Sequence, residues 1–299
     1  MVTAREIKNR IESIGNVQKI TSTMKAVASA KLNRVRDRME NARPFAREIE
    51  DSIRELISRN PEISHPYFAP EEEDLAGTEP EADRPGYLVL SGDRGLCGSY
   101  NHNVFRHVEG LIKEHRERGD EPSLYVVGKR GVRHFRTRDV HVEREFEDLW
   151  DDLNYVNSLA VTRALVDGFE TGNLTSVGIV FTEFESPMVH KVKPYPLLPL
   201  TREEFEKEEL DLPVDFLYEP DARDVVDHLF PRHVRTQVYQ AMLESYASEQ
   251  AARMVAMDNA TENADEMIDD LTLEYNQVRQ ASITRQIAEI SGGAEALKE

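Results

Sequence analysis

The chain has 299 residues, a formal net charge of −19 at pH 7 and one cysteine. This acidic balance argues against general nucleic-acid binding, which needs a basic footprint. No run of about 18 apolar residues is present that could span a bilayer. A lone Cys97 excludes an internal disulfide and fits a reducing compartment. The length allows about two domains.

The first segment, from Thr3 to about residue 60, is predicted to form one very long helix. Thr3 and Glu6 have the spacing of a capping box, which would start it. Pro44 should kink or interrupt it, because proline lacks an amide donor and crowds the preceding turn. Apolar residues recur every three or four positions, as on one face of a helix: Ile7, Ile11, Ile14, Val17, Ile20, Met24, Val27, Val35 and Met39.

Charge is unevenly distributed along the N-terminal third of the chain. Residues 1–47 hold eleven Lys or Arg and four Asp or Glu, a net of +7, whereas residues 60–85 hold one Arg and eight acids, a net of −7. The basic segment is therefore expected to face an acidic partner surface, with a solvated helix face as the alternative. Residues 61–85 are interpreted as an acidic, solvated loop with no packing role.

The pattern changes in residues 86–220, where short apolar runs suit buried strands. These runs are Tyr87–Leu90, Leu124–Val127 and Val177–Phe181, and helical stretches lie between them near Asn103–Arg118 and Asn154–Thr171. Alternating strands and helices predict a small, mostly parallel, Rossmann-like α/β domain. Four later prolines are expected to break regular structure: Pro187, Pro194, Pro196 and Pro199.

Residues 221–299 return to helix, with Pro231 expected at the first helical position and Gly292-Gly293 as the C-cap. A lone helix of this length cannot bury its apolar stripe, so the N- and C-terminal helices are predicted to form a long antiparallel coiled coil. The apolar residues of the last two turns are expected to lie outside this seam, because a helix that outruns its partner needs another protein to cover it. The sequence leaves open where this overrun begins.

No catalytic constellation is evident. The sequence lacks a G-x-x-x-x-G-K-[ST] phosphate loop, an H-E-x-x-H motif and a G-x-S-x-G motif. Gly92–Gly98 follows the first strand but is spaced G-x-x-G-x-x-G, so a tight strand-to-helix turn is favoured over a dinucleotide site. No cofactor or metal is predicted, and Cys97 is expected to be a small buried thiol.

Three stretches, in order, resemble the gamma subunits of F-type ATP synthases. They are Ile14–Leu32, Ser91–Asn101, and most of the last helix through Ala247–Met257 and Tyr275–Thr284. The resemblance covers essentially the full length. It implies a non-catalytic central rotor shaft that couples proton translocation to conformational cycling of the beta-subunit catalytic sites. The implied partners are the alpha and beta subunits, the epsilon subunit and the c-ring, at the cytoplasmic face of the bacterial plasma membrane.

The resemblance also implies contact residues for those partners. By motif position they are Met24, Lys25, Arg253, Arg279, Gln280 and Thr284. Met24 would face acidic beta-subunit loops, and Arg279 and Gln280 would contact a beta-subunit catch loop. Packing within the coiled coil is the alternative for Met24. One departure stands out, because Gln286 occupies a position where the family usually has an acid.

Two other classes of function remain open at this point. A nucleotide-binding α/β enzyme would use the central domain, and its lack of a phosphate loop speaks against it. A stand-alone coiled-coil scaffold would self-associate along its seam, and it would not explain the ordered motifs.

Overall fold

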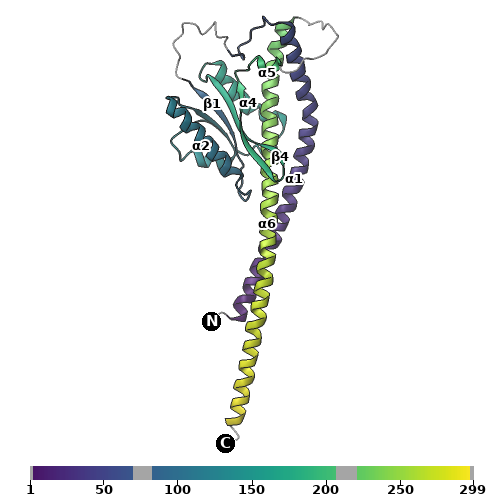
Figure 1. The fold of residues 1–299 in the computed structure, drawn as a ribbon, viewed down its shortest axis with the longest axis vertical. Helices are drawn as coiled ribbons and strands as arrows, with labels where there is room; N and C mark the ends of the chain where they lie inside the picture. Colours follow the sequence, from purple (N-terminus) through teal and green to yellow (C-terminus); the bar gives the residue numbers. More distant parts are fainter. Residues whose placement is uncertain (1–2, 70–82, 207–220, 297–299) are drawn as a thin grey trace. The chain divides into compact units, whose positions relative to one another are not determined.

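The computed structural model describes residues 3–69, 83–206 and 221–296, and the chain divides by packing into two compact units. The helix-pair unit comprises residues 1–29 and 253–299, and the sheet unit comprises residues 30–252. Two long helices contribute to both units: α1 (Ala4–Arg59) and α6 (Ala222–Ala296) (Figure 1).

Helix α1 begins as the sequence predicts. The backbone N–H of Thr3 donates to Glu6 Oε2 at 2.8 Å, and the N–H of Glu6 donates to Thr3 Oγ1 at 3.3 Å, which completes a capping box. The bond from the Thr3 amide stabilises the carboxylate and lowers the pKa of Glu6 below its ordinary value.

Helix α1 then runs through Pro44 to Arg59, so the predicted interruption at this proline is wrong. The following turns carry Ala46, Ile49 and Ile53, which are buried in the sheet unit. Their packing offsets the backbone hydrogen bond that the proline removes.

Helix α6 begins earlier and ends later than the sequence predicts. Its first turn is capped by Asp221, whose Oδ1 accepts a hydrogen bond from the backbone N–H of Asp224 at 2.9 Å. Pro231 lies inside the helix, next to the fully buried Phe230, so it is not the first helical residue. Gly292-Gly293 does not end the helix either, because α6 continues to Ala296. Glycine costs about 1 kcal/mol in a helix interior, which weakens a helix without terminating it.

The sheet unit contains a five-stranded sheet in the order β3-β2-β1-β4-β5. Strands β3, β2, β1 and β4 are parallel, and β5 pairs antiparallel with β4. This confirms the predicted mostly parallel α/β sheet. The strands are β1 (Pro85–Leu90), β2 (Ser123–Val127), β3 (His141–Phe146), β4 (Ser176–Ser186) and β5 (Val189–Leu198).

The three central strands, β2, β1 and β4, contain the predicted apolar runs. The two edge strands, β3 and β5, were not predicted. Strand β3 is polar and mostly exposed, so it lacks the apolar signal of a buried strand. Strand β5 contains Pro194 and Pro196, which pair with Val180 and Gly178 of β4. The expectation that these prolines break regular structure is wrong, because an edge strand does not need every amide for its ladder. Pro187 does lie in the turn between β4 and β5.

Helices cover the sheet and fill its core. Helix α2 (Tyr100–Arg118) and α4 (Tyr155–Glu170) lie where the sequence places helices, and two short helices were not predicted: α3 (Lys129–Phe135) and α5 (Glu203–Glu206). Helix α2 lies along one side of the sheet (Figure 1). The core beneath it is fully apolar, with every member at most 8 % exposed: Val89, Val104, Val108, Ile112, Leu124, Val126, Val132, Phe135 and Val180.

Polar contacts also attach α6 to the sheet unit. The Tyr100 hydroxyl lies 2.7 Å from Ser245 Oγ, and the Ser248 hydroxyl donates to the backbone oxygen of Thr182 at 3.1 Å. Trp150 stacks on Tyr246 with ring planes 5° apart and centroids at 5.7 Å. These residues fix one turn of α6 against β4 and α2 because their polar groups are buried and need partners.

The acidic loop is only partly described, and the described part packs. The Tyr67 hydroxyl lies 2.7 Å from Glu170 Oε1 with its ring buried, and the Phe68 ring meets the Phe230 ring edge-on at 5.0 Å. The expectation of no packing role is therefore wrong for these residues. The most acidic stretch lies outside the described residues.

One glycine is required for the sheet unit to close. Gly128 joins β2 to α3 with a φ of +100°, and a Cβ there would lie 2.0 Å from the backbone oxygen of Ser91. Only glycine satisfies both the left-handed backbone and this close approach.

We expect Gly128→Ala to destabilise the chain by more than about 2 kcal/mol, because backbone strain and steric overlap add. The matched control is Gly110→Ala, in the exposed middle of α2, where a Cβ meets nothing within 4 Å. The control should raise stability by about 0.5–1 kcal/mol through helix propensity. Urea denaturation followed by circular dichroism distinguishes the two, and equal midpoints would contradict the steric argument.

Candidate interaction surface

Side-chain contacts between α1 and α6 define the register of the helix-pair unit. Gln18 Nε2 donates to Asp265 Oδ1 at 2.6 Å, Thr21 Oγ1 lies 2.7 Å from Thr261 Oγ1, and Lys25 forms an ion pair with Asp258. In each pair the two residue numbers add to 282 or 283. The helices therefore run antiparallel without a break in register, as the coiled-coil prediction requires.

The seam between the two helices is more polar and smaller than predicted. Its buried side chains are Ile7, Thr21 and Ala28 of α1 and Met257 and Ala264 of α6. Small side chains allow the helices to approach closely, and the two threonines satisfy each other across the seam.

Three residues expected in this stripe lie outside the seam. Val17, Ile20 and Val27 are 51 %, 59 % and 52 % exposed, so their assignment to the coiled-coil interface is wrong. On α6, Met267 and Leu273 are exposed as well, at 53 % and 64 %. The helix pair thus presents apolar side chains on its outer surface, beyond what two helices can bury against each other.

The basic charge of α1 has an acidic counterpart within the same chain. Residues 258–278 of α6 hold seven Asp or Glu and no Lys or Arg, and the register places this stretch opposite residues 5–25 of α1. Lys25 and Asp258 are both 42 % exposed, so their ion pair contributes only about 0.2–1 kcal/mol. The acidic surface predicted to face the N-terminal segment is thus supplied in part by α6 itself.

Helix α6 extends beyond the start of α1. The register places Ala4, the first residue of α1, opposite Arg279. The seventeen helical residues that follow Arg279, up to Ala296, therefore extend roughly 26 Å past the start of α1. The start of the overrun, which the sequence leaves open, is therefore near Arg279, and the overrun is about five turns long. We call residues 279–291 the terminal segment; each of its described side chains is exposed.

The terminal segment carries an uncovered apolar face. Ile283, Ile287 and Ile290 are 47 %, 62 % and 73 % exposed and follow one another at intervals of four and three residues. This spacing aligns them on one side of the helix. Arg279 precedes Ile283 by four residues, and the Arg279 guanidinium lies 6.0 Å from the Tyr275 ring centroid. Such an exposed cation–π contact is weak, about 0.5–1 kcal/mol, and leaves the guanidinium accessible.

The six predicted contact residues fall into two groups. Met24 and Lys25 are half-buried near the seam, and Arg253 is buried at 8 % exposure. Arg279, Gln280 and Thr284 are all exposed on the terminal segment, as is Gln286. Along α6 the distance from Arg253 to Arg279 is roughly 39 Å. The structure thus brings together three residues at each end of the helix pair and does not unite the six.

The sequence did not identify the polar seam residues. Gln18, Thr21 and Thr261 are polar at positions where a coiled coil usually has aliphatic side chains. Their alignment depends on the register of two segments about 240 residues apart, and a helical pattern in each segment alone does not fix it.

The glycine-rich loop after β1 opposes a bound phosphate. A Cβ on Gly92 would lie 2.7 Å from the buried carboxylate of Glu249, and the Gly92 amide already donates to Asn101 Oδ1 at 2.9 Å. Asp93 accepts from the Lys129 amide at 2.9 Å, and burial raises the pKa of Asp93. Gly98, with a φ of +56°, confirms the predicted conformational turn. Cys97 is buried, as predicted.

The mostly parallel sheet and the antiparallel pair of long helices define an α/β protein with a separate helix-pair unit. Residues 3–297 match the ATP synthase family. The chain is 41 % identical to the ATP synthase gamma chain of Salinibacter ruber, with 100 % of this chain and 99 % of that one covered. It is 39 % identical to the gamma chain of Acidithiobacillus ferrooxidans over 99 % of this chain and 100 % of that one.

Solved structures share the fold. A chain of the Euglena gracilis mitochondrial ATP synthase, in an OSCP/F1/c-ring assembly, aligns with a TM-score of 0.64 at 18 % identity, covering 98 % of this chain and 94 % of that one. A chain of the Tetrahymena thermophila central stalk and c-ring aligns with a TM-score of 0.58 at 24 % identity, covering 81 % and 99 %.

The chain belongs to the ATP synthase gamma-chain family. This membership confirms the predicted role as a non-catalytic rotor subunit of ATP synthase that associates with other subunits of the complex. The nucleotide-binding enzyme and the stand-alone scaffold are therefore set aside. Among the described residues, no helix is long and apolar enough to cross a membrane.

The register is testable by cross-linking. We expect Thr21→Cys combined with Thr261→Cys to form an intramolecular disulfide under mild oxidation, because the two hydroxyls are in contact. Thr21→Cys with Thr272→Cys is the control, since the second position lies eleven residues, or roughly 16 Å, further along α6. Cys97 is buried and stays in both variants. Equal cross-linking, measured by mass spectrometry under non-reducing conditions, would contradict the antiparallel register.

Proposed function

We propose that the helix pair acts as the shaft that couples proton translocation to conformational cycling of beta-subunit catalytic sites. In this proposal alternating alpha and beta subunits surround the helix pair, and the rest of the chain contacts the epsilon subunit and the c-ring. The complex would hold this chain peripherally, at the cytoplasmic face of a bacterial plasma membrane. Family membership supports these partners as a class, and the individual contacts are the proposal.

The observation that carries this proposal is the terminal segment. Three exposed isoleucines on one face of a helix without a partner leave apolar surface in water. Burial of such side chains is worth about 1.5–3 kcal/mol each, so a surrounding protein would gain by covering them. Arg279, Gln280 and Thr284 lie on the same segment and would supply the polar contacts. Gln286 would contribute a neutral hydrogen-bonding group where an acid is usual.

The second group of residues would act near the other end of the helix pair. Met24 is half-buried, and Val27, three residues further along α1, is exposed. The Met24 side chain can therefore contact both the seam and a partner protein. Arg253 is buried and would act through the position of neighbouring turns. Each angle of a shaft with different sides stabilises a different partner conformation through differential contacts, which is the physical basis of coupling.

We further propose four functional parts along the chain. Residues 1–60 and 221–299 would be the coiled-coil helices, residues 61–85 an acidic loop and residues 86–220 the α/β domain. Packing divides the chain differently, since each long helix contributes to both compact units. The functional division follows the partners each part would meet.

The test begins with a tagged chain purified from its native membrane, with partners identified by mass spectrometry. Recovery of alpha, beta and epsilon subunits with ATPase activity supports the proposed assembly. Recovery of the chain alone, or with unrelated proteins, would overturn it.

In the same assembly we expect Met24→Lys to lower proton pumping per ATP hydrolysed several-fold while leaving subunit recovery unchanged. The added charge would disturb partner contacts at a half-buried position. Met188→Lys is the matched control, because Met188 is 78 % exposed in the β4–β5 turn of the sheet unit. Pumping per ATP that is unchanged in Met24→Lys would refute its assigned role.

A further inference from the structure

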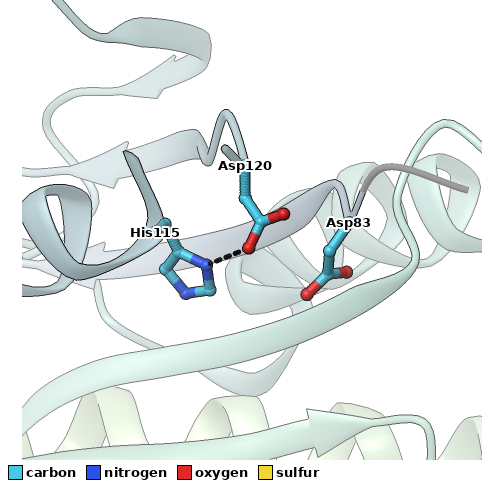
Figure 2. A group of neighbouring side chains, drawn as sticks. All are labelled: Asp83, His115 and Asp120. Atoms are coloured by element: carbon cyan, nitrogen blue, oxygen red, sulfur yellow. Dashed lines mark hydrogen bonds and ion pairs between the residues drawn. The ribbon is translucent and has the colours of Figure 1, made fainter. Parts of the chain in front are cut away.

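A cluster of metal-ligating side chains lies in the sheet unit, away from the proposed contact residues. Asp83, His115 and Asp120 each offer one ligand atom, and these atoms lie within 4.8 Å of one another. It is the one such group of three found among the described residues. Figure 2 shows the two carboxylates and the imidazole directed toward a common space.

The fold builds this cluster from three separate segments. His115 is in the last turn of α2, and Gly119 follows with a left-handed φ of +93°. This turn directs the chain back, so that the Asp120 amide donates to the His115 oxygen at 3.0 Å. Asp83 directly precedes β1, and its carboxylate accepts a hydrogen bond from the Thr175 hydroxyl. Backbone contacts that do not depend on a ligand thus place Asp120 beside His115, whereas the exposed Asp83 carboxylate bonds to Thr175 and can rotate.

The imidazole of His115 is oriented from both sides. Its Nε2 lies 2.7 Å from the Tyr87 hydroxyl, and its Nδ1 lies 3.3 Å from Asp120 Oδ2. The Tyr87 hydroxyl oxygen can accept the hydrogen of Nε2, which leaves Nδ1 available to bind a metal. A metal-bound histidine usually donates its other ring N–H to such an oxygen, which fixes ring and tautomer.

The spacing of His115 Nδ1 and Asp120 Oδ2 suits a shared ion as well as a direct hydrogen bond. The two atoms lie 3.3 Å apart, within hydrogen-bond reach. Two ligands at about 2.0–2.1 Å from a tetrahedral zinc are about 3.3–3.4 Å apart. Rotation of the exposed Asp83 side chain would bring the third ligand into place.

We propose that Asp83, His115 and Asp120 bind one divalent transition-metal ion of the Zn²⁺ class. The imidazole nitrogen favours such an ion over Mg²⁺ or Ca²⁺, which prefer all-oxygen sites. Two carboxylates would balance the charge of the ion, and water would complete the coordination. The His115 and Asp120 side chains are 11 % and 14 % exposed, and the exposed Asp83 gives solvent access to the site.

The ion would join the start of β1 to the end of α2. An ion that binds the folded chain alone stabilises that chain through linkage. Its role would be structural, independent of the coupling proposed for the helix pair.

The test is zinc binding by the full-length chain, freed of its tag and stripped with chelator. Isothermal titration calorimetry should give one equivalent of bound Zn²⁺, and His115→Gln should abolish it. Asp120→Asn and Tyr87→Phe should each weaken binding at least tenfold, the first by losing a ligand charge and the second by losing the partner of Nε2. His141→Gln is the matched control, since His141 also contacts an acid, Glu143, at 2.9 Å but lies exposed on β3; it should bind as the parent does.

Folding of each variant is checked separately. Far-ultraviolet circular dichroism establishes that it is folded, and the shift of its thermal midpoint on adding Zn²⁺ is compared with its own metal-free value. Co²⁺ should give visible absorption bands in the parent that are missing in His115→Gln. No binding by the parent at micromolar Zn²⁺, or equal binding in parent and His115→Gln, would overturn the proposal.

Discussion

A helix of 56 or 75 residues cannot stand alone in water with an apolar stripe along its length. Its backbone hydrogen bonds are satisfied internally, but each exposed aliphatic side chain forgoes the free energy that burial would supply. In the sheet unit, α1 and α6 bury large aliphatic and aromatic residues such as Ile53, Phe230 and Val234. In the helix-pair unit, α1 and α6 pack only against each other within the described chain. The side chains buried there therefore differ from those buried in the sheet unit.

The helix-pair unit solves this constraint with a narrow, partly polar seam. Thr21 and Thr261 meet across it, and Gln18 and Lys25 reach acids of α6. Polar contacts of this kind contribute little net stability, but a shifted register would separate Gln18 and Lys25 from the acids that they contact. The remaining aliphatic residues, including Ile20 and Leu273, face outward. In a rotor subunit such a surface is available for contacts with other subunits of the complex.

The sheet unit is stabilised by an apolar core between its sheet and its helices. Its parallel strands pack against α2, and the carboxylate of Glu249 on α6 lies beside Gly92 in the loop after β1. The Glu249 side chain occupies the space beside Gly92, so in this chain the Rossmann-like topology serves as a scaffold. The His115 cluster lies at the opposite ends of the strands, next to the first residues of β1 and β2, where the proposed ion would join segments rather than react.

The sequence by itself determined the long helices, the capping box at Thr3, the apolar central strands and the family, because each depends on residues close together in the chain or on ordered motifs. Only the tertiary structure decided which aliphatic residues lie in the seam, that the long helices run unbroken through Pro44 and Pro231, and that Pro194 and Pro196 lie in an edge strand. It also decided where α6 outruns α1 and that Asp83 meets His115. These features depend on register and packing between segments far apart in the chain, where burial overrides local propensity.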